Sequence, residues 1–143
     1  MKASKKTETE VKNVLKGFAE SYERRDLEGV LARVAPDEDV VLYGTGADEK
    51  RVGLQEIRKQ VERDWAQTDE IAMEFDSISV SGADSFAWAA ADGFFKARVN
   101  GQEMSMPARL TCVFERRNGD WLIVQSHFST PATSQEEGAS LPA

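Results

Sequence analysis

The stretch that decides the fold is residues 86–128, which read FAWAAADGFFKARVNGQEMSMPARLTCVFERRNGDWLIVQSHF. Two Asn-Gly pairs, Asn100-Gly101 and Asn118-Gly119, divide this stretch into three segments rich in β-branched and aromatic residues. Asn-Gly between two such segments is a strong signal for a β-hairpin. The stretch therefore predicts three antiparallel strands in a meander, at about 86–99, 104–115 and 121–128. Pro107 in the middle strand predicts a free edge or a bulge there.

A fourth strand is expected just before the meander, because apolar and polar residues alternate from Ile71 to Phe75. The alternation then slips by one residue, and Ile78 and Val80 take over the apolar positions. Such a slip predicts a β-bulge, which bends and twists a strand. Long antiparallel strands with bulges curl, so we expect one bent sheet.

Three amphipathic helices are predicted upstream of these strands. Thr7 and Glu10 form a possible capping box for the first helix. Asp26 is a good N-cap for the second helix, and Pro36 ends it. The apolar positions at helical spacing are Val11, Val14, Leu15, Phe18 and Tyr22 in the first helix, Leu27, Val30, Leu31 and Val34 in the second, and Leu54, Ile57, Val61 and Trp65 in the third. Between the second and third helices, residues 40–43 predict a short strand and residues 46–50 a polar loop.

This order of elements predicts an α+β fold, with the three N-terminal helices packed in the concave face of a strongly curved, mainly antiparallel sheet. A single domain is expected over residues 7–130. Residues 131–143 are rich in Ser, Pro, Ala and Glu and are predicted to form a mobile C-terminal tail. Such a curl leaves a pocket between helices and sheet, and its outer face is free for a partner.

Composition excludes several kinds of partner. The chain has 143 residues, of which 41% are hydrophobic, and its 18 Lys+Arg against 25 Asp+Glu give a net charge of -7. The hydrophobic fraction is high enough for a folded core. So acidic a chain is a poor binder of nucleic acid and of anionic membranes, because both require clustered positive charge.

The counts of cysteine and histidine limit the chemistry further. Cys112 is the one cysteine and His127 the one histidine, so internal disulfides, multi-cysteine metal sites and two-histidine zinc sites are excluded. No phosphate-binding glycine loop is present, and we expect no cofactor. The polar N-terminus has no signal or membrane-spanning stretch behind it, which predicts a cytoplasmic location.

Arg109, Gln125 and His127 are the first candidate ligand-binding residues, and the hairpin register decides whether they meet. A three-residue loop at 117–119 would place Arg109 opposite His127 on the pocket face, whereas a two-residue loop would place Leu110 opposite His127. We prefer the first register because it separates an apolar layer from a polar one. Arg109 would then bind a carboxylate or phosphate, unless it pairs with Asp39, Glu62 or Asp64. His127 is the only candidate general base, unless it donates to a backbone carbonyl.

Four aromatic residues are further candidates for ligand contact. Tyr22 and Trp65 end the stripes of their helices and are expected near the pocket mouth, and Tyr43 and Trp88 lie in strands. The simpler interpretation for all four is core packing. The same two interpretations apply to Met73, Met104 and Met106. Cys112 is expected to be buried and inert, and in the preferred register it points toward the outer face.

The sequence resembles the SnoaL-like and nuclear transport factor 2-like superfamily of cone-shaped, cystatin-like α+β domains over roughly residues 7–130. The resemblance lies in DLEGVL at 26–31, GLQEIR at 53–58, and the ending RLTCVF at 109–114, NGDWLIV at 118–124 and HFS at 127–129. This ending is most similar to the association domain of calmodulin-dependent protein kinase II and its stand-alone bacterial relatives.

The resemblance implies a homodimer built through the outer sheet face, with higher assemblies possible, but no single activity. Gly44 stands where the ketosteroid isomerase branch would have its catalytic aspartate, and the paired histidines of the scytalone dehydratase branch are missing. Three functions are therefore considered: a pocket protein that binds a small polar organic acid, an association module without catalysis, and an isomerase, dehydratase or cyclase that uses His127.

Overall fold

Helix α1 (Lys5–Glu23) opens the structure, which is a computed structural model that describes residues 1–142. The hydroxyl of Ser4 accepts a hydrogen bond of 3.1 Å from the backbone N–H of Thr7, so Ser4 is the N-cap. The predicted capping box of Thr7 and Glu10 is therefore wrong. Ser4 offers the same hydroxyl chemistry three residues earlier, and the helix gains most of a turn by starting there.

Helix α2 (Leu27–Leu31) has the predicted N-cap, because the Asp26 carboxylate accepts a hydrogen bond of 3.0 Å from the N–H of Gly29. The helix ends well before Pro36 because the following residues join the sheet. The N–H of Ala35 donates to the carbonyl of Ile123, whose own N–H donates to the carbonyl of Arg33. These bonds tie the end of α2 to the sheet.

The strands of the described chain form one six-stranded sheet, in which only the pair of β1 and β6 is parallel. In spatial order the strands are β2 (Lys50–Val52), β1 (Val41–Tyr43), β6 (Asp120–Ser129), β5 (Gln102–Arg117), β4 (Phe86–Val99) and β3 (Glu70–Ala83). Helix α3 (Leu54–Ala66) follows β2 directly. The predicted meander is confirmed, whereas β2 is an additional strand that begins where the predicted polar loop ends.

The predicted bulge in the fourth strand lies between Phe75 and Ser77 of β3. Gly93 of β4 is paired with Phe75 at this point, and a Cβ atom built on Gly93 would lie 1.9 Å from the carbonyl oxygen of Glu74. The two backbones approach each other as closely as this because glycine has no side chain. The bulge therefore depends on Gly93.

The segment of β5 around Pro107 is a local edge of the sheet. Residues 102–108 pair with β4 alone, because β6 ends at Ser129 opposite Arg109. Pro107 lacks an N–H and is tolerated where one side of the strand is unpaired. The expectation of an edge at Pro107 is confirmed.

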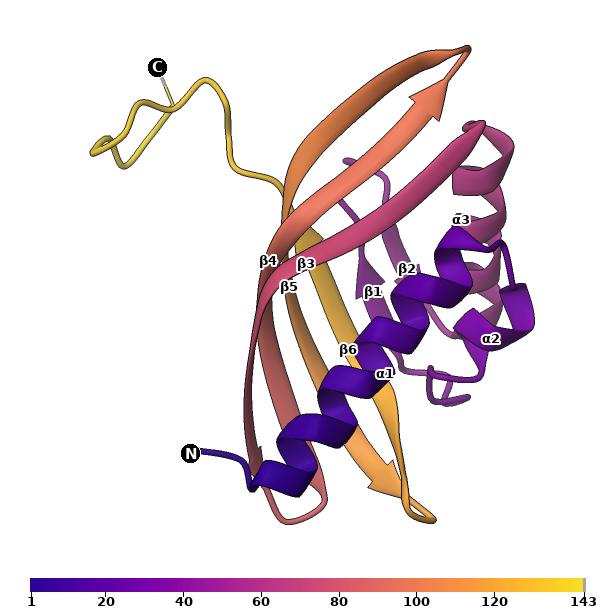
Figure 1. Ribbon diagram of the computed structural model, residues 1–143, viewed down its shortest axis with the longest axis vertical. Coiled ribbons are helices and arrows are strands. Elements are labelled where there is room, and N and C mark those ends of the chain that lie inside the picture. Colours follow the sequence, from indigo (N-terminus) through magenta and orange to yellow (C-terminus); the bar gives the residue numbers. More distant parts are fainter. Residues whose placement is uncertain (143) are drawn as a thin grey trace.

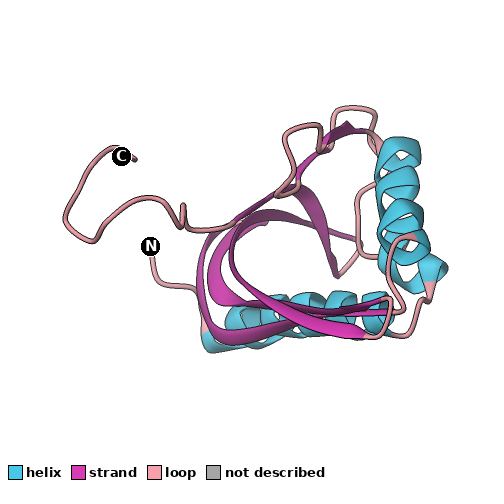
Figure 2. Ribbon diagram, turned by 90° about the horizontal axis from the view of Figure 1, so that it is seen from above, coloured by secondary structure: helices cyan, strands magenta, loops and turns pink. Residues whose placement is uncertain are grey.

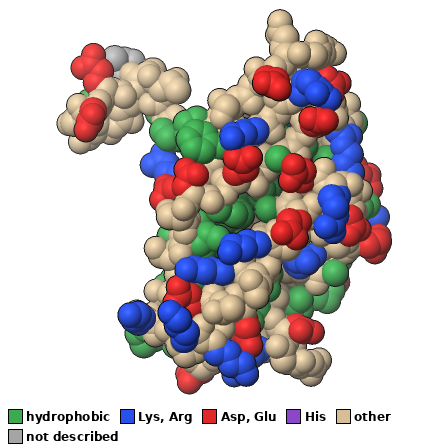
Figure 3. All heavy atoms as spheres, in the orientation of Figure 1, with side chains coloured by type: hydrophobic (Ala, Val, Ile, Leu, Met, Phe, Trp, Pro, Cys, Tyr) green, Lys and Arg blue, Asp and Glu red, His purple; other side chains and the backbone are tan. Residues whose placement is uncertain are grey.

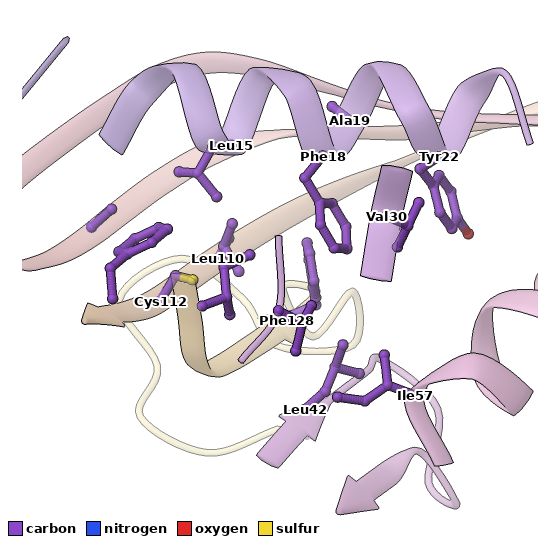
Figure 4. Packing of buried hydrophobic residues seen from close by; sticks show 14 of the residues in the cluster. Leu15, Phe18, Ala19, Tyr22, Val30, Leu42, Ile57, Leu110, Cys112 and Phe128 are labelled. Carbon is purple, nitrogen blue, oxygen red and sulfur yellow. The ribbon is translucent and has the colours of Figure 1, made fainter. Parts of the chain in front are cut away.

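Figures 1 and 2 show the helices beside the curled sheet. The core consists of buried residues from the helices and from the inner face of this sheet. In the close view of Figure 4, Leu15, Phe18 and Tyr22 of α1 point toward Leu110 and Phe128 of the sheet. The structure is α+β, with helices packed against a mixed, mostly antiparallel sheet, as predicted.

Residues 130–142 contain no helix or strand and extend away from the sheet (Figure 1). The last residue of the predicted tail, Ala143, lies outside the described residues. None of the helices within residues 1–142 is both long and apolar enough to span a membrane. The face that carries α1 shows basic and acidic side chains interspersed rather than a patch of one sign (Figure 3).

Candidate functional site

A cavity of about 290 Å³ lies between the ends of α1 and α3 and the inner face of the sheet. Most of its wall is apolar, with rings and thioethers from several elements. These residues are Phe18 of α1, Val61 of α3, Leu42 of β1, Ile71 and Met73 of β3, Phe95, Ala97 and Val99 of β4, Met104 and Met106 of β5, and Phe128 of β6. Predominantly apolar and aromatic walls of this kind are typical of pockets that bind small organic molecules.

A hydrogen-bonded cluster forms the polar part of the cavity wall. The hydroxyl of Tyr22 donates to Oδ2 of Asp64 at 2.8 Å, and Nε2 of Gln60 donates to Oδ1 of Asp64 at 2.7 Å. Nε of Arg51 donates to Oε1 of Gln60 at 2.9 Å, which fixes the orientation of the amide. The carboxylate of Asp64 is therefore held in place by two neutral donors.

Glu49 supplies a second carboxylate to the cavity wall, with a cation beside it. Its Oε1 accepts from Arg63 at 3.0 Å and from Nε2 of Gln60 at 3.2 Å, and its Oε2 accepts from the N–H of Gly46 at 2.9 Å. Arg63 also pairs with Asp48 at 2.8 Å. The charge of Glu49 is thus compensated from outside the cavity.

Burial changes the pKa values of two residues in the cluster. Desolvation raises the pKa of Asp64 above its usual range, and the hydrogen bonds from Tyr22 and Gln60 oppose this effect only in part. Desolvation raises the pKa of Tyr22 as well, and the neighbouring carboxylate of Asp64 adds to it. The phenol therefore stays protonated and acts as a hydrogen-bond donor to Asp64.

Helical periodicity explains why Gln60 and Asp64 face the cavity. Each lies three residues after an apolar residue that is buried in the core, Gln60 after Ile57 and Asp64 after Val61. Two polar residues on an apolar helix face are the sequence signal for this cluster. From the sequence, Asp64 was considered only as a partner of Arg109, and Gln60 and Glu49 were not among the predicted site residues.

Arg109, Gln125 and His127 do not line the cavity, so their predicted placement is wrong. The hairpin turns at Asn118-Gly119 alone, with Arg117 opposite Asp120. Val124 is then an extra residue in β6, so the register shifts and Thr111, not Arg109, lies opposite His127. All three candidates are exposed on the outer face of the sheet, whereas Leu110 and Phe128 face inward.

Only Tyr22 of the four aromatic candidates lines the cavity. Trp65 is partly buried and packs on Tyr22 with ring centroids 5.9 Å apart, and its Nε1 donates to the backbone carbonyl of Tyr22 at 3.0 Å. Tyr43 is exposed on the outer face, where its ring lies 5.0 Å from that of His127, and Trp88 is exposed on the same face. A shift of one residue in the pairing register moves a strand residue to the other face of the sheet. The sequence alone therefore could not decide whether Tyr43 and Trp88 face the cavity.

The three methionine candidates lie as one of their two interpretations predicted, whereas Cys112 faces the opposite side of the sheet from the one expected. Met73, Met104 and Met106 all line the cavity. Cys112 is buried, as predicted, but it faces the core and not the outer face, and burial raises the pKa of its thiol. Within residues 1–142, no three His, Cys, Asp or Glu side chains are arranged to hold a metal ion.

The sequence pattern of the SnoaL-like domain matches residues 11–133. The chain belongs to the SnoaL-like domain family. Among curated proteins, none matches the sequence significantly.

The fold of this SnoaL-like protein is similar to that of solved nuclear transport factor 2-like proteins. One from Salmonella enterica is 18% identical, covers 96% of this chain and 99% of that chain, and has a TM-score of 0.83. A candidate dehydratase from Streptomyces avermitilis is also 18% identical, covering 87% and 97%, with a TM-score of 0.79. A candidate calcium/calmodulin-dependent protein kinase II association domain from Xanthomonas campestris is 25% identical, covering 87% of each chain, with a TM-score of 0.76.

Proposed function

We propose that this SnoaL-like protein binds a small, largely apolar organic molecule in the cavity between its helices and its sheet. The observation that carries the proposal is the hydrogen-bonded pair of Tyr22 and Asp64 set in an otherwise apolar wall. Ligand sites commonly combine apolar walls with a few fixed polar groups, which orient the ligand. Flexible thioethers, such as those of Met73 and Met106, allow the wall to adapt to the ligand.

The polar group of the ligand is expected to be a hydrogen-bond donor, such as a hydroxyl or an amine. Asp64 is an acceptor with lone pairs beyond the two hydrogen bonds that it already accepts. The acidic ligand considered from the sequence depended on Arg109, which is exposed on the other face of the sheet. Two carboxylates in the wall, from Glu49 and Asp64, disfavour an anion further.

Filling the cavity tests this function. Ala97 lines the cavity, so Ala97→Phe is expected to abolish the thermal stabilisation that small apolar alcohols and amines give to the wild type. Ala66→Phe places the same ring at an exposed position of α3 outside the cavity wall and should leave the stabilisation unchanged. Binding that survives in Ala97→Phe would place the ligand elsewhere and contradict the proposal.

Self-association through the outer sheet face is a second candidate function. Three large aromatic residues of this face are solvent-exposed, Phe86 at 47%, Trp88 at 40% and Tyr43 at 38%, and large exposed rings are common in the centres of protein interfaces. The likeness to a candidate kinase association domain adds support from the family. A homodimer would cover these rings and would leave the cavity on the opposite side of the sheet free.

Catalysis by His127 loses its support, because the imidazole is exposed on the outer face beside Tyr43. A general base must lie within hydrogen-bond reach of the proton that it takes from the substrate. A ligand in the cavity lies across the sheet from His127. The isomerase, dehydratase or cyclase hypothesis in its His127 form is therefore not carried forward.

A further inference from the structure

Asp64 differs from the other carboxylate of the cavity in having no direct ion pair among the described residues. Within residues 1–142, no Lys, Arg or His nitrogen lies within 4.0 Å of its oxygens, whereas Glu49 has Arg63 at 3.0 Å. The two groups that hold Asp64, Tyr22 and Gln60, are both neutral. Hydrogen bonds therefore solvate the charge of Asp64 without a direct ion pair, and the more distant attraction of Arg63 is too weak to keep the pKa of Asp64 from rising.

An ionised carboxylate in this position is costly, because partial burial removes water that would stabilise its charge. Buried charges in proteins are normally paired with an opposite charge or a metal. The same desolvation explains why the pKa of Asp64 is raised. A cation that entered the cavity would supply the missing pair.

The remainder of the wall also suits a cation that carries an apolar body. The rings of Phe18, Tyr22, Phe95 and Phe128 line the same cavity, and their π-faces attract cations while their bulk contacts alkyl or aryl groups. Thioethers of Met73 and Met106 add polarisable surface without charge. Within the described chain, no Lys, Arg or His side chain forms part of this wall.

We propose that the ligand of the cavity is a small organic amine, bound as its ammonium ion with the nitrogen at Asp64 and the apolar part among the rings. This inference rests on the proposed function and specifies the class of ligand. The ammonium would donate to the free lone pairs of Asp64, and Tyr22 and Gln60 would continue to hold the carboxylate. The net charge of -7 would also attract a cation to the protein.

Ligands matched in shape and different in charge test the proposal. Each set of probes is a triad of an amine, an alcohol and a carboxylate that share one apolar group, such as 2-phenylethylamine, 2-phenylethanol and 3-phenylpropionate. Further triads carry other aryl and alkyl groups. Their dissociation constants are measured by calorimetry at neutral pH. The amine is expected to bind about tenfold more tightly than the matched alcohol, because a charge-assisted hydrogen bond is stronger than a hydrogen bond between a carboxylate and a neutral hydroxyl. The carboxylate is expected to be the weakest binder of each triad.

Asp64→Asn and Glu62→Gln separate the local carboxylate from general charge. Both changes remove one negative charge from α3, but Glu62 is exposed and does not line the cavity. The preference for the amine should disappear in Asp64→Asn and persist in Glu62→Gln. If Asp64→Asn does not fold, the wild type at acidic pH replaces it, because protonation of Asp64 should remove the same preference.

The outcomes distinguish this inference from the proposed function. Alcohols or carboxylates that bind in the cavity as tightly as the amines would overturn the amine proposal and leave the cavity as a ligand site. An amine preference that is retained in Asp64→Asn would also overturn it. If no member of any triad binds the wild type, both the proposed function and the amine proposal fail.

Discussion

Asp64 of α3 contributes a carboxylate to the wall of the cavity. It is positioned by Gln60 one turn earlier on α3 and by Tyr22 from α1, so that the cluster forms only when the two helices pack. Neither bond compensates fully for the loss of water around the carboxylate, as the direction of its pKa shift indicates. The polar group that serves the cavity is therefore expected to weaken the fold at neutral pH.

The pH dependence of stability should reveal this cost. Because the pKa of Asp64 is higher in the folded protein, the folded state binds its proton more tightly than the unfolded state. The resulting stabilisation is complete below the ordinary pKa of about 3.9 and is lost as the pH rises through the raised value. The free energy of unfolding of the wild type relative to Asp64→Asn, from urea denaturation, should therefore fall from about pH 4 to pH 7.

Glu62→Gln serves as the control for this measurement, since the side chain of Glu62 is exposed on the same helix. Its free energy of unfolding relative to the wild type should not show the trend predicted for Asp64→Asn. A constant difference between Asp64→Asn and the wild type across this range would contradict the assignment of a raised pKa.

The end of α3 is held by Arg25, which lies just beyond α1 with a positive φ of 58°. Its guanidinium donates to the backbone carbonyls of Trp65 at 2.7 Å, Thr68 at 2.8 Å and Asp69 at 3.0 Å. These carbonyls lie at and just after the last turn of α3, where helical hydrogen bonding ends. Arg25 thus fixes the segment that contributes Gln67 and Thr68 to the cavity wall.

Arg25→Ala is expected to lower the free energy of unfolding by about 1–2 kcal/mol, because three carbonyls lose a charged donor. Arg24→Ala is the matched control, since Arg24 is exposed and has only a 3.7 Å ion pair with Asp26. Chemical denaturation of both variants checks the difference. Equal effects of the two substitutions would show that the carbonyl contacts contribute no stability.

The bulge of β3 leads to a prediction about the sheet. In Gly93→Ala the new methyl group would overlap the carbonyl oxygen of Glu74, so the two strands would have to separate. We expect a loss of about 1–3 kcal/mol in unfolding free energy, which is typical of overpacking that forces the backbone to shift. Ser79→Ala, on the exposed face of β3, should cost less than about 0.5 kcal/mol. A wild-type-like melting temperature for Gly93→Ala would contradict the close approach.

The two faces of the curled sheet lie in different surroundings. Its inner face and the helices enclose the cavity, whereas its outer face displays Trp88, Tyr43 and His127 to solvent. Successive side chains of a strand point to opposite faces of the sheet, so one residue faces the cavity side and the next faces the outer side. Ligand binding and self-association are therefore expected to be separable by mutation.

Sedimentation of the whole molecule tests the outer face. The wild type is expected to sediment as a dimer, and Trp88→Glu should weaken the dimer about tenfold or more, because a charge would replace a central ring. Met104→Glu alters an apolar residue that is 60% exposed at the cavity, and it should leave the dimer intact. A wild type that remains monomeric at high concentration would contradict this proposal.

Local signals in the sequence were sufficient for most of the architecture. The stripe of α1, the Asp26 cap, both Asn-Gly turns and the bulge of β3 each depend on residues close together in the chain. Turn geometry and periodicity are properties of neighbouring residues, and for this reason they could be interpreted without coordinates. The family was indicated separately, by the resemblance of the motifs at 26–31, 53–58 and 109–129.

Only the tertiary structure decided which side chains share the cavity. A single extra residue, Val124, shifts the pairing of β5 and β6, and no nearby turn signal marks it. Arg109 and His127 therefore lie outside, while Tyr22 and Asp64, 42 residues apart, lie 2.8 Å from each other. Contacts between distant elements depend on how whole helices and strands pack, and a one-residue change of register reverses a strand's faces, which local sequence patterns do not specify.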